Sequence, residues 1–244
     1  MRYFIKLSYK GTHYHGWQYQ PNASSVQEEL EKAFSLILRE EIAITGAGRT
    51  DTGVHAKNFI AHFETVNSLD ANQIKELIYK LNSYISKDIA IHKIYQVDAK
   101  MHARFDAKER TYQYYITTTK NPFFTESAWY VHGKLDVAKM NLACEIIKEY
   151  SDFGSFAKLH SDNKTNICNL MEAHWELQDE LLVFTIKADR FLRNMVRAIV
   201  GTMVDIGQGK TSLADLRKIV ESKDRNRAGR SVPGHALFLV DIKY

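Results

Sequence analysis

RYFIKLSY, residues 2–9, carries an aromatic or aliphatic side chain at every odd position from 3 to 9. A period of two is typical of a β-strand with one buried face. The stretch SSVQEELEKAFSLILREE, residues 24–41, then changes to a helical period with one apolar stripe. Ser25 and Glu28 form a capping box at its start. The chain therefore opens with a strand followed by an amphipathic helix.

The same periodicities predict strands and helices along the rest of the chain. Strands are expected at 41–45, 58–65, 89–98, 108–119, 167–177, 180–188 and 236–244. Helices are expected after Asp70 and Asp136, over 190–207 and over 213–222. The first half therefore has the strand and helix order of a ferredoxin-like unit, and the second half resembles it with additions.

This order predicts an α/β (α+β) fold of two ferredoxin-like halves that share a mostly antiparallel central sheet, with a cleft between them. The polar residues Asp98 to Lys100 suggest the division, which gives an N-terminal half over 1–99 and a C-terminal half over 100–244. No sequence repeat accompanies the two halves, so this prediction depends on element order alone.

Composition excludes little beyond membrane proteins and disulfide-rich secreted proteins. The 244 residues carry a formal net charge of +4, which permits a polyanionic partner without requiring one. The two cysteines, Cys144 and Cys168, have no metal-ligand spacing and are expected to be buried thiols. No signal peptide and no membrane span is expected, and the protein is predicted to be cytoplasmic.

The loop GAGRTDTGVHA, residues 46–56, places Arg49 and Asp51 two residues apart among three glycines. A dinucleotide-binding GxGxxG motif fails because Asp51 stands where the third glycine is required. The later GQGKTS fails as a phosphate-binding P-loop because Val204 replaces the first glycine. An ordinary turn with an ion-paired Arg49 remains one interpretation of the loop, and a site for a large ligand is the other.

Three further segments are candidates for the same site. Arg190, Arg193 and Arg197 interrupt the apolar stretch RFLRNMVRAIVG, where they form either a solvated stripe or the partner that keeps Asp51 ionised. The strand ERTYQYY, residues 109–115, presents either an aromatic core stripe or a stacking platform for a base. The aromatic loop YKGTHYHGWQYQ, residues 9–20, is a candidate lid over a cleft.

Five segments in this order resemble the tRNA pseudouridine synthase A family: YKGTHYHGWQYQP, GRTDTGVHA, ARFDAKERTYQY, FLRNMVRAIVG and ALFLVDI. The resemblance extends from Ile5 to Ile242. Two positions depart from the family pattern: Thr52 stands where the family usually has alanine, and Ala236 where it tends to have glycine.

The resemblance implies a homodimeric isomerase that converts uridine to pseudouridine at positions 38, 39 and 40 of the tRNA anticodon stem-loop, without cofactor or metal. It implies that Asp51 is the catalytic nucleophile and that Arg197 pairs with it. It further implies that Arg49 displaces the target base, Tyr112 packs on that base and Leu239 lines its pocket. Three roles stay open for Asp51: attack on the sugar C1′, attack on the base, or assistance in the loss of the base.

Basic residues on several segments are candidates for the tRNA backbone: Lys108, Arg110, Arg193, Arg225, Arg227 and Arg230. Two other hypotheses compete with the isomerase. One is a non-catalytic RNA-binding module on a ferredoxin-like scaffold, and the other is a magnesium-dependent aspartyl-phosphate enzyme. A binding module should tolerate Asp51→Asn, whereas the isomerase should lose turnover. The aspartyl-phosphate enzyme should depend on magnesium.

Overall fold

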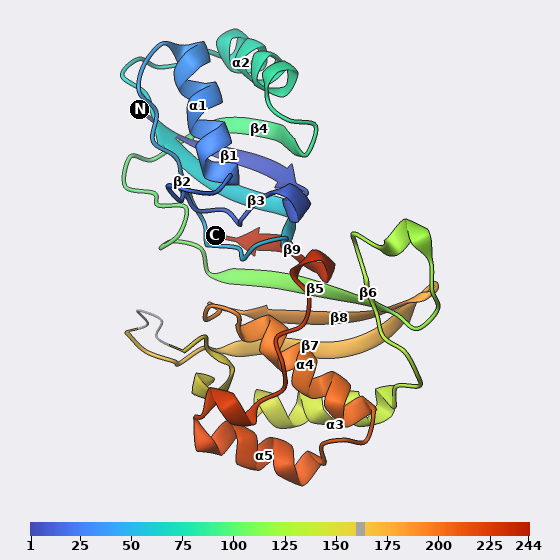
Figure 1. Cartoon of the computed structure of the whole chain (residues 1–244). Helices are drawn as coiled ribbons and strands as arrows, with labels where there is room; N and C mark the ends of the chain where they lie inside the picture. The colour runs from blue at the N-terminus through green and yellow to red at the C-terminus, as the bar shows by residue number, and fades with distance from the viewer. Residues whose placement is uncertain (160–163) are drawn as a thin grey trace. The chain divides into compact units, whose positions relative to one another are not determined.

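The computed structural model describes residues 1–159 and 164–244 (Figure 1). The chain forms two compact units. Unit 1 comprises Met1–Lys108 and Leu239–Tyr244, and unit 2 comprises Glu109–Phe238. The predicted α/β class with mostly antiparallel strands is confirmed: the described residues form nine strands and five α-helices. The shared sheet and the cleft stay predictions, and each unit is described by itself.

Unit 1 has the predicted ferredoxin-like order of strands and helices. Its elements are β1 (Arg2–Tyr9), η1 (Gly11–His13), α1 (Val26–Leu38), β2 (Thr45–Gly46), β3 (His55–Glu64), α2 (Ala71–Tyr84), β4 (Ile89–Val97) and most of β9 (Leu237–Lys243). The strands lie in the order β4-β1-β3-β9, with β2 also paired to β3. β1 pairs antiparallel with both β3 and β4. Strand β1 is therefore internal to this part of the sheet.

The core of unit 1 lies on both sides of β3. Phe59, Ala61 and Phe63 are buried on one side of the strand, and Ile60 and His62 are buried on the other. Helix α1 begins at Ser25, whose side chain accepts a hydrogen bond from the backbone N–H of Glu28, and α2 begins with a complete capping box at Asp70. Local capping chemistry therefore fixes where both helices start.

Unit 2 consists of a short antiparallel sheet and three helices. Its strands are β5 (Glu109–Thr117), β6 (Trp129–Tyr130), β7 (Leu170–Gln178) and β8 (Leu181–Ala188), in the order β5-β8-β7, with β6 parallel to β5. Its helices are α3 (Val137–Lys148), α4 (Met195–Gly207) and α5 (Leu213–Ser222), with 3₁₀ turns η2 (Pro122–Phe124), η3 (Gly154–Phe156), η4 (Arg225–Arg227) and η5 (Gly234–Ala236). Helix α3 packs against β7 and contacts both α4 and α5.

Helix α4 differs from its prediction at its N-terminal end. The apolar pattern predicted a helix from residue 190, but α4 begins at Met195 because Asn194 adopts a left-handed conformation with φ of 68°. Residues 190–194 are therefore not helical. Of the three arginines in this stretch, only Arg197 lies in the helix, so Arg193 and Arg197 do not share a helix face.

The turn between β7 and β8 also differs from its prediction by one residue. The strands predicted at 167–177 and 180–188 leave residues 178 and 179 for the turn, but Gln178 pairs with Leu181, so Asp179 and Glu180 form it. Asp179 has φ of 52°, a conformation that aspartate tolerates better than most residues. The turn therefore lies where the chain can accept a left-handed residue.

A buried histidine links β3 to the segment that follows β4. The ring nitrogen Nδ1 of His62 accepts a hydrogen bond of 3.1 Å from the backbone N–H of Ala103, and its ring lies edge-on to His102 at 4.7 Å. Burial lowers the pKa of His62 to about 4, and the neighbouring His102 and Arg2 act in the same direction, while Glu64 acts weakly against them. His62 is therefore neutral in the folded protein at pH 7.

We expect the free energy of unfolding to fall as the pH is lowered from about 6.5 to about 4. In this window the unfolded chain protonates His62 and the folded protein does not, so acid favours unfolding. After a discount for solvent screening, the effect should be about 2 kcal/mol. Urea denaturation at pH 7 and pH 4.5 measures the change. His62→Gln keeps an acceptor for Ala103, and a pH dependence equal to that of the unchanged protein would contradict the assignment.

Candidate active site

The loop after β2 forms a tight turn that carries Asp51. The backbone N–H of Ala47 donates to Ile60 at 2.8 Å, which anchors the start of the loop to β3. The N–H of Val54 donates to the carbonyl of Asp51 at 3.1 Å, which closes a four-residue turn. Gly53, at the third position of this turn, has φ of 76°. Asp51 therefore occupies the first position of a turn whose geometry depends on glycine.

Residues 11–17 hold this turn from behind through their backbone. The N–H of Trp17 donates to the carbonyl of Thr50 at 3.3 Å. Gly16 has φ of 98°, and a Cβ atom there would lie 2.3 Å from the same carbonyl oxygen. Such a contact is closer than any side chain permits, so only glycine lets the two segments approach this closely.

Side chains complete the support beneath the turn. The hydroxyl groups of Tyr9 and Thr50 share a buried hydrogen bond of 2.9 Å. Trp17 stacks on Phe59 of β3 with ring centroids 4.2 Å apart. Thr50, the residue before Asp51, is therefore held through both its backbone and its side chain.

The aromatic loop at 9–20 is a support and not a lid. Tyr14 and Trp17 are buried in unit 1, so the prediction of a lid was wrong. The carbonyl of Tyr14 accepts the N–H of Gly53 at 3.2 Å, and its hydroxyl donates to Glu29 at 2.6 Å. Burial, followed by this hydrogen bond to Glu29, raises the pKa of Tyr14 above its ordinary range. Tyr14 and Trp17 therefore belong to the core beneath Asp51, whereas Tyr19 of the same loop is exposed.

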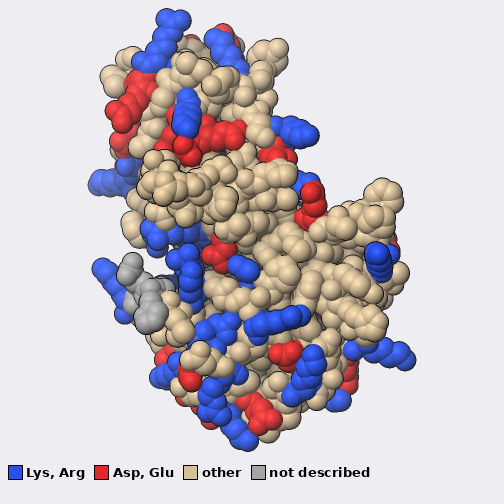
Figure 2. Space-filling view, in the orientation of Figure 1, with Lys and Arg blue, Asp and Glu red and all other residues tan. Residues whose placement is uncertain are grey.

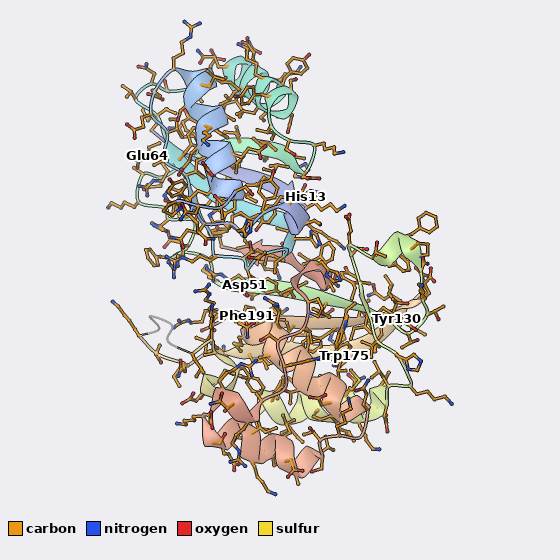
Figure 3. The ribbon with its side chains drawn as sticks, in the orientation of Figure 1. His13, Asp51, Glu64, Tyr130, Trp175 and Phe191 are labelled. Carbon is orange, nitrogen blue, oxygen red and sulfur yellow. The ribbon has the colours of Figure 1, made fainter. Side chains whose placement is uncertain are left out.

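The tyrosine strand of unit 2 carries aromatic side chains with different neighbours. Tyr112 meets the ring of Phe191 edge-to-face at 5.1 Å. Tyr114 is buried and donates from its hydroxyl to the carbonyl of Pro233 at 3.0 Å, as a core residue. The sequence predicted no role for Phe191, which lies in the FLRNMVRAIVG segment. Phe191 and Asp51 are both labelled in Figure 3.

Arg197 lies in the first turn of α4 and is fixed by the segment before η5. Its Nε donates to the carbonyl of Val232 at 2.7 Å, and the N–H of Val232 donates back to the carbonyl of Arg197 at 3.3 Å. Arg197 and Tyr112 therefore belong to unit 2, whereas Arg49, Asp51 and Leu239 belong to unit 1. The predicted pair of Asp51 and Arg197 joins residues of different units and stays a prediction.

Comparison with known proteins identifies the family. A family model described as tRNA pseudouridine synthase matches residues 6–106 and 150–244. The chain belongs to this family. It is 54% identical to the tRNA pseudouridine synthase A of Bacteroides fragilis, with all of this chain and 96% of that protein covered. The corresponding protein of Bacteroides thetaiotaomicron is 52% identical, and that of Acetivibrio thermocellus is 37% identical over 98% of this chain.

The resemblance drawn from the five motifs is therefore confirmed. Membership of the tRNA pseudouridine synthase family also confirms the predicted enzyme class, an isomerase of pseudouridine synthesis in tRNA processing. The match favours the isomerase over the non-catalytic binding module and the aspartyl-phosphate enzyme. The family match does not assign roles to individual residues.

The candidate cations for the tRNA backbone differ in how they are held. Arg110 donates from its guanidinium to the carbonyl of Asp189 at 2.7 Å. Arg225 is half-buried and bonds to the carbonyls of Ala228 and Gly229 and to a serine hydroxyl. The side chains of Lys108, Arg193, Arg227 and Arg230 are exposed. In Figure 2, Lys and Arg side chains gather over the face of unit 2 that carries α4.

Other residues noted in the sequence have ordinary structural surroundings. Cys144 and Cys168 are buried free thiols, as expected, and burial raises their pKa values to about 12 and about 11. In the described ranges, no three His, Cys, Asp or Glu side chains group in a way that could hold a metal ion. None of the described helices has the length and apolar character needed to cross a bilayer.

We expect Gly16→Ala to reduce both stability and pseudouridine formation, because its Cβ would displace the carbonyl of Thr50 next to Asp51. The loss should be about 2–3 kcal/mol in urea denaturation, with at least a tenfold fall in turnover. Gly133 is a matched control, since it has a similar φ of 96° but nothing within 4 Å of the added Cβ. Gly133→Ala should therefore cost only about 1 kcal/mol and keep turnover. Equal effects in the two variants would refute the close contact.

Proposed function

We propose that this enzyme converts uridine to pseudouridine at positions 38, 39 and 40 of the tRNA anticodon stem-loop, with Asp51 as the nucleophile. The full-length match to the family supports the reaction class. The observation that carries the residue assignment is the turn at Asp51, which the backbones of Tyr14 and Trp17 hold in place. A carboxylate on a fixed backbone turn, with the small neighbours Thr50, Thr52 and Gly53, suits attack on a bulky nucleotide.

The reaction depends mainly on positioning the uracil and the sugar. The C1′–N1 bond breaks, the uracil rotates and a C1′–C5 bond forms, while C5 loses a proton and N1 gains one. Because substrate and product are isomers, no electrons or groups are exchanged with another molecule. Asp51 supplies the carboxylate that drives separation of base and sugar, by attack on either C1′ or the base.

Arg197 of unit 2 pairs with Asp51 in this proposal and keeps the carboxylate ionised. The hydrogen bond from its Nε to Val232 fixes one edge of the guanidinium and thereby its direction. A cationic partner of this kind favours the charged form of the carboxylate nucleophile and restrains its rotamer. The detached uracil must also stay enclosed, and Tyr112 and Leu239 supply apolar walls that exclude water.

A base inside a stem must leave the stack before it can react. Flipping costs roughly a few kcal/mol, which a side chain in the vacated space offsets. Arg49 is exposed, long and planar, and it lies two residues from Asp51, so it fits this role. The ring of Tyr112, held edge-on by Phe191, supports packing against the flipped base.

The rest of the tRNA is held by cations in this proposal. Six residues are assigned to its backbone: Lys108, Arg110, Arg193, Arg225, Arg227 and Arg230. The four exposed members support phosphate contact most directly, because the guanidinium groups of Arg110 and Arg225 already bond to carbonyl oxygens. We further propose that the enzyme acts as a homodimer in the cytoplasm, where tRNA is its substrate.

We expect Asp51→Asn to abolish pseudouridine formation, with at least a thousandfold loss of turnover, while tRNA binding stays within about threefold. The asparagine keeps the size of the side chain and the backbone bond to Val54. Single-turnover assays and filter binding on the same preparation separate the two effects.

Thr52→Ala is the matched control, because Thr52 is the exposed neighbour of Asp51 in the same turn. We expect its turnover to stay within about twofold of the unchanged enzyme. Normal turnover in Asp51→Asn would remove the nucleophile assignment. A large loss in Thr52→Ala would instead point to a general sensitivity of the loop.

The positions modified can be read from cellular tRNA. In cells that lack the gene, we expect pseudouridine to disappear at positions 38, 39 and 40 and to persist elsewhere in the same tRNAs. Complementation with the unchanged gene should restore all three, and complementation with Asp51→Asn should restore none. Loss at other positions would keep the chemistry and replace the proposed substrate.

A further inference from the structure

Unit 2 contains a cavity of about 420 Å³ that the proposed catalytic residues do not line. Its walls come from β6 and the two residues that follow, from the second half of α4, and from Lys210 and Arg230. Cavities that enclose a small ligand commonly measure about 300–1,000 Å³. The cavity is therefore large enough for one nucleotide.

The aromatic side of this cavity is already fixed in place. Trp129 of β6 meets Tyr114 edge-on at 6.4 Å, and the guanidinium of Arg230 lies over its ring at 5.3 Å. Tyr130, labelled in Figure 3, is 46% exposed. Trp129, Tyr130 and Arg230 therefore offer flat surfaces of the kind on which bases stack.

The backbone beneath Arg230 is fixed by a close contact with α4. A Cβ atom on Gly201 would lie 1.9 Å from the carbonyl oxygen of Arg230, so the two backbones touch. The N–H of Gly229 also donates to the hydroxyl of Thr202 at 2.9 Å. Arg230 therefore projects from a fixed point beside α4, although its own side chain is exposed.

The charges around the cavity fall into a cationic group and an acceptor group. Arg230 and Lys210 are exposed, and within the described part of the chain neither makes an ion pair. Asp205 and the C-terminal end of α4 supply hydrogen-bond acceptors and negative potential. The cations can bind a phosphate, and the carboxylate can accept hydrogen bonds from sugar hydroxyl groups. Because only a ribonucleotide has a 2′-hydroxyl, the lining matches a ribonucleotide better than a deoxyribonucleotide.

We propose that this cavity is a second ribonucleotide-binding site, in which Arg230 and Lys210 hold the phosphate, Asp205 the 2′-hydroxyl, and Trp129 with Tyr130 the base. The ligand is either a nucleotide of the bound tRNA outside the target stem or a free ribonucleotide. The tRNA source rests on the proposed function, and the free-nucleotide source does not. In both cases the site acts in binding and takes no part in bond breaking.

Nucleotide binding is tested first without catalysis. AMP is titrated into the full-length enzyme while the indole N–H resonance of Trp129, assigned with Trp129→Phe, is followed by NMR. The proposal predicts a saturable shift that dAMP produces at least fivefold more weakly. The double variant Arg230→Gln/Lys210→Gln should weaken AMP binding about tenfold, and Asp205→Asn should remove the preference for AMP over dAMP.

The tRNA source is tested by steady-state kinetics. The same double variant should raise KM for tRNA about tenfold and leave kcat within twofold. Lys218→Gln is the matched control, since Lys218 is an exposed cation on α5 outside the cavity, and its KM should not change. An AMP effect without a KM effect identifies a free nucleotide, and effects on both identify a nucleotide of tRNA. A KM effect alone is already expected from the backbone contact proposed for Arg230 and counts against a site in the cavity.

The proposal is wrong if the double variant leaves AMP binding unchanged, and the tRNA source is wrong if Lys218→Gln changes KM as much. The first of these outcomes is independent of the proposed function. If the unchanged enzyme made no pseudouridine, the proposed function would fail, and the AMP titration would still report on the cavity.

Discussion

The contact between the backbone at Gly16 and the carbonyl of Thr50 is the constraint on which the candidate site depends. It leaves no room for a side chain, and it places the positive φ of Gly16 directly behind Asp51. The hydrogen bonds from Trp17 to Thr50 and from Gly53 to Tyr14 lie on either side of it. The position of the Asp51 backbone is therefore set by the first strand and the approach to α1, and not by the loop alone.

Unit 2 holds Arg197 and Arg230 in the same way, through contacts of the main chain. Gly201 of α4 touches the backbone of Arg230, and the reciprocal bonds between Arg197 and Val232 continue the contact. In both units the main chain fixes the start of the functional side chain. Groups held in this way lose little freedom when the substrate binds, which is the condition for efficient positioning. The proposed reaction depends on such positioning, because the detached base must be turned and rejoined to the same sugar.

The sequence predicted what local chemistry determines and failed where distant packing decides. Period and capping residues located α2 and α3, because Asp70 and Asp136 bond to nearby N–H groups. The left-handed Asn194 that delays α4 leaves the apolar period unchanged, so no pattern indicates it. The lid prediction for the loop of Trp17 was wrong because the amino-acid composition of the loop does not reveal that Trp17 stacks on Phe59 of β3. Motif order predicted Asp51 as the candidate nucleophile, whereas only the structure reveals the backbone contacts that hold its turn.

The support from the main chain also explains which residues around Asp51 are free to vary. Thr52 stands where the family usually has alanine, yet the turn closes through the carbonyl of Asp51 and the N–H of Val54. The positive φ belongs to Gly53, and the side chain of Thr52 is exposed. A change at Thr52 therefore alters neither the turn nor its supports. A change at Gly16, which is farther away along the chain, alters both.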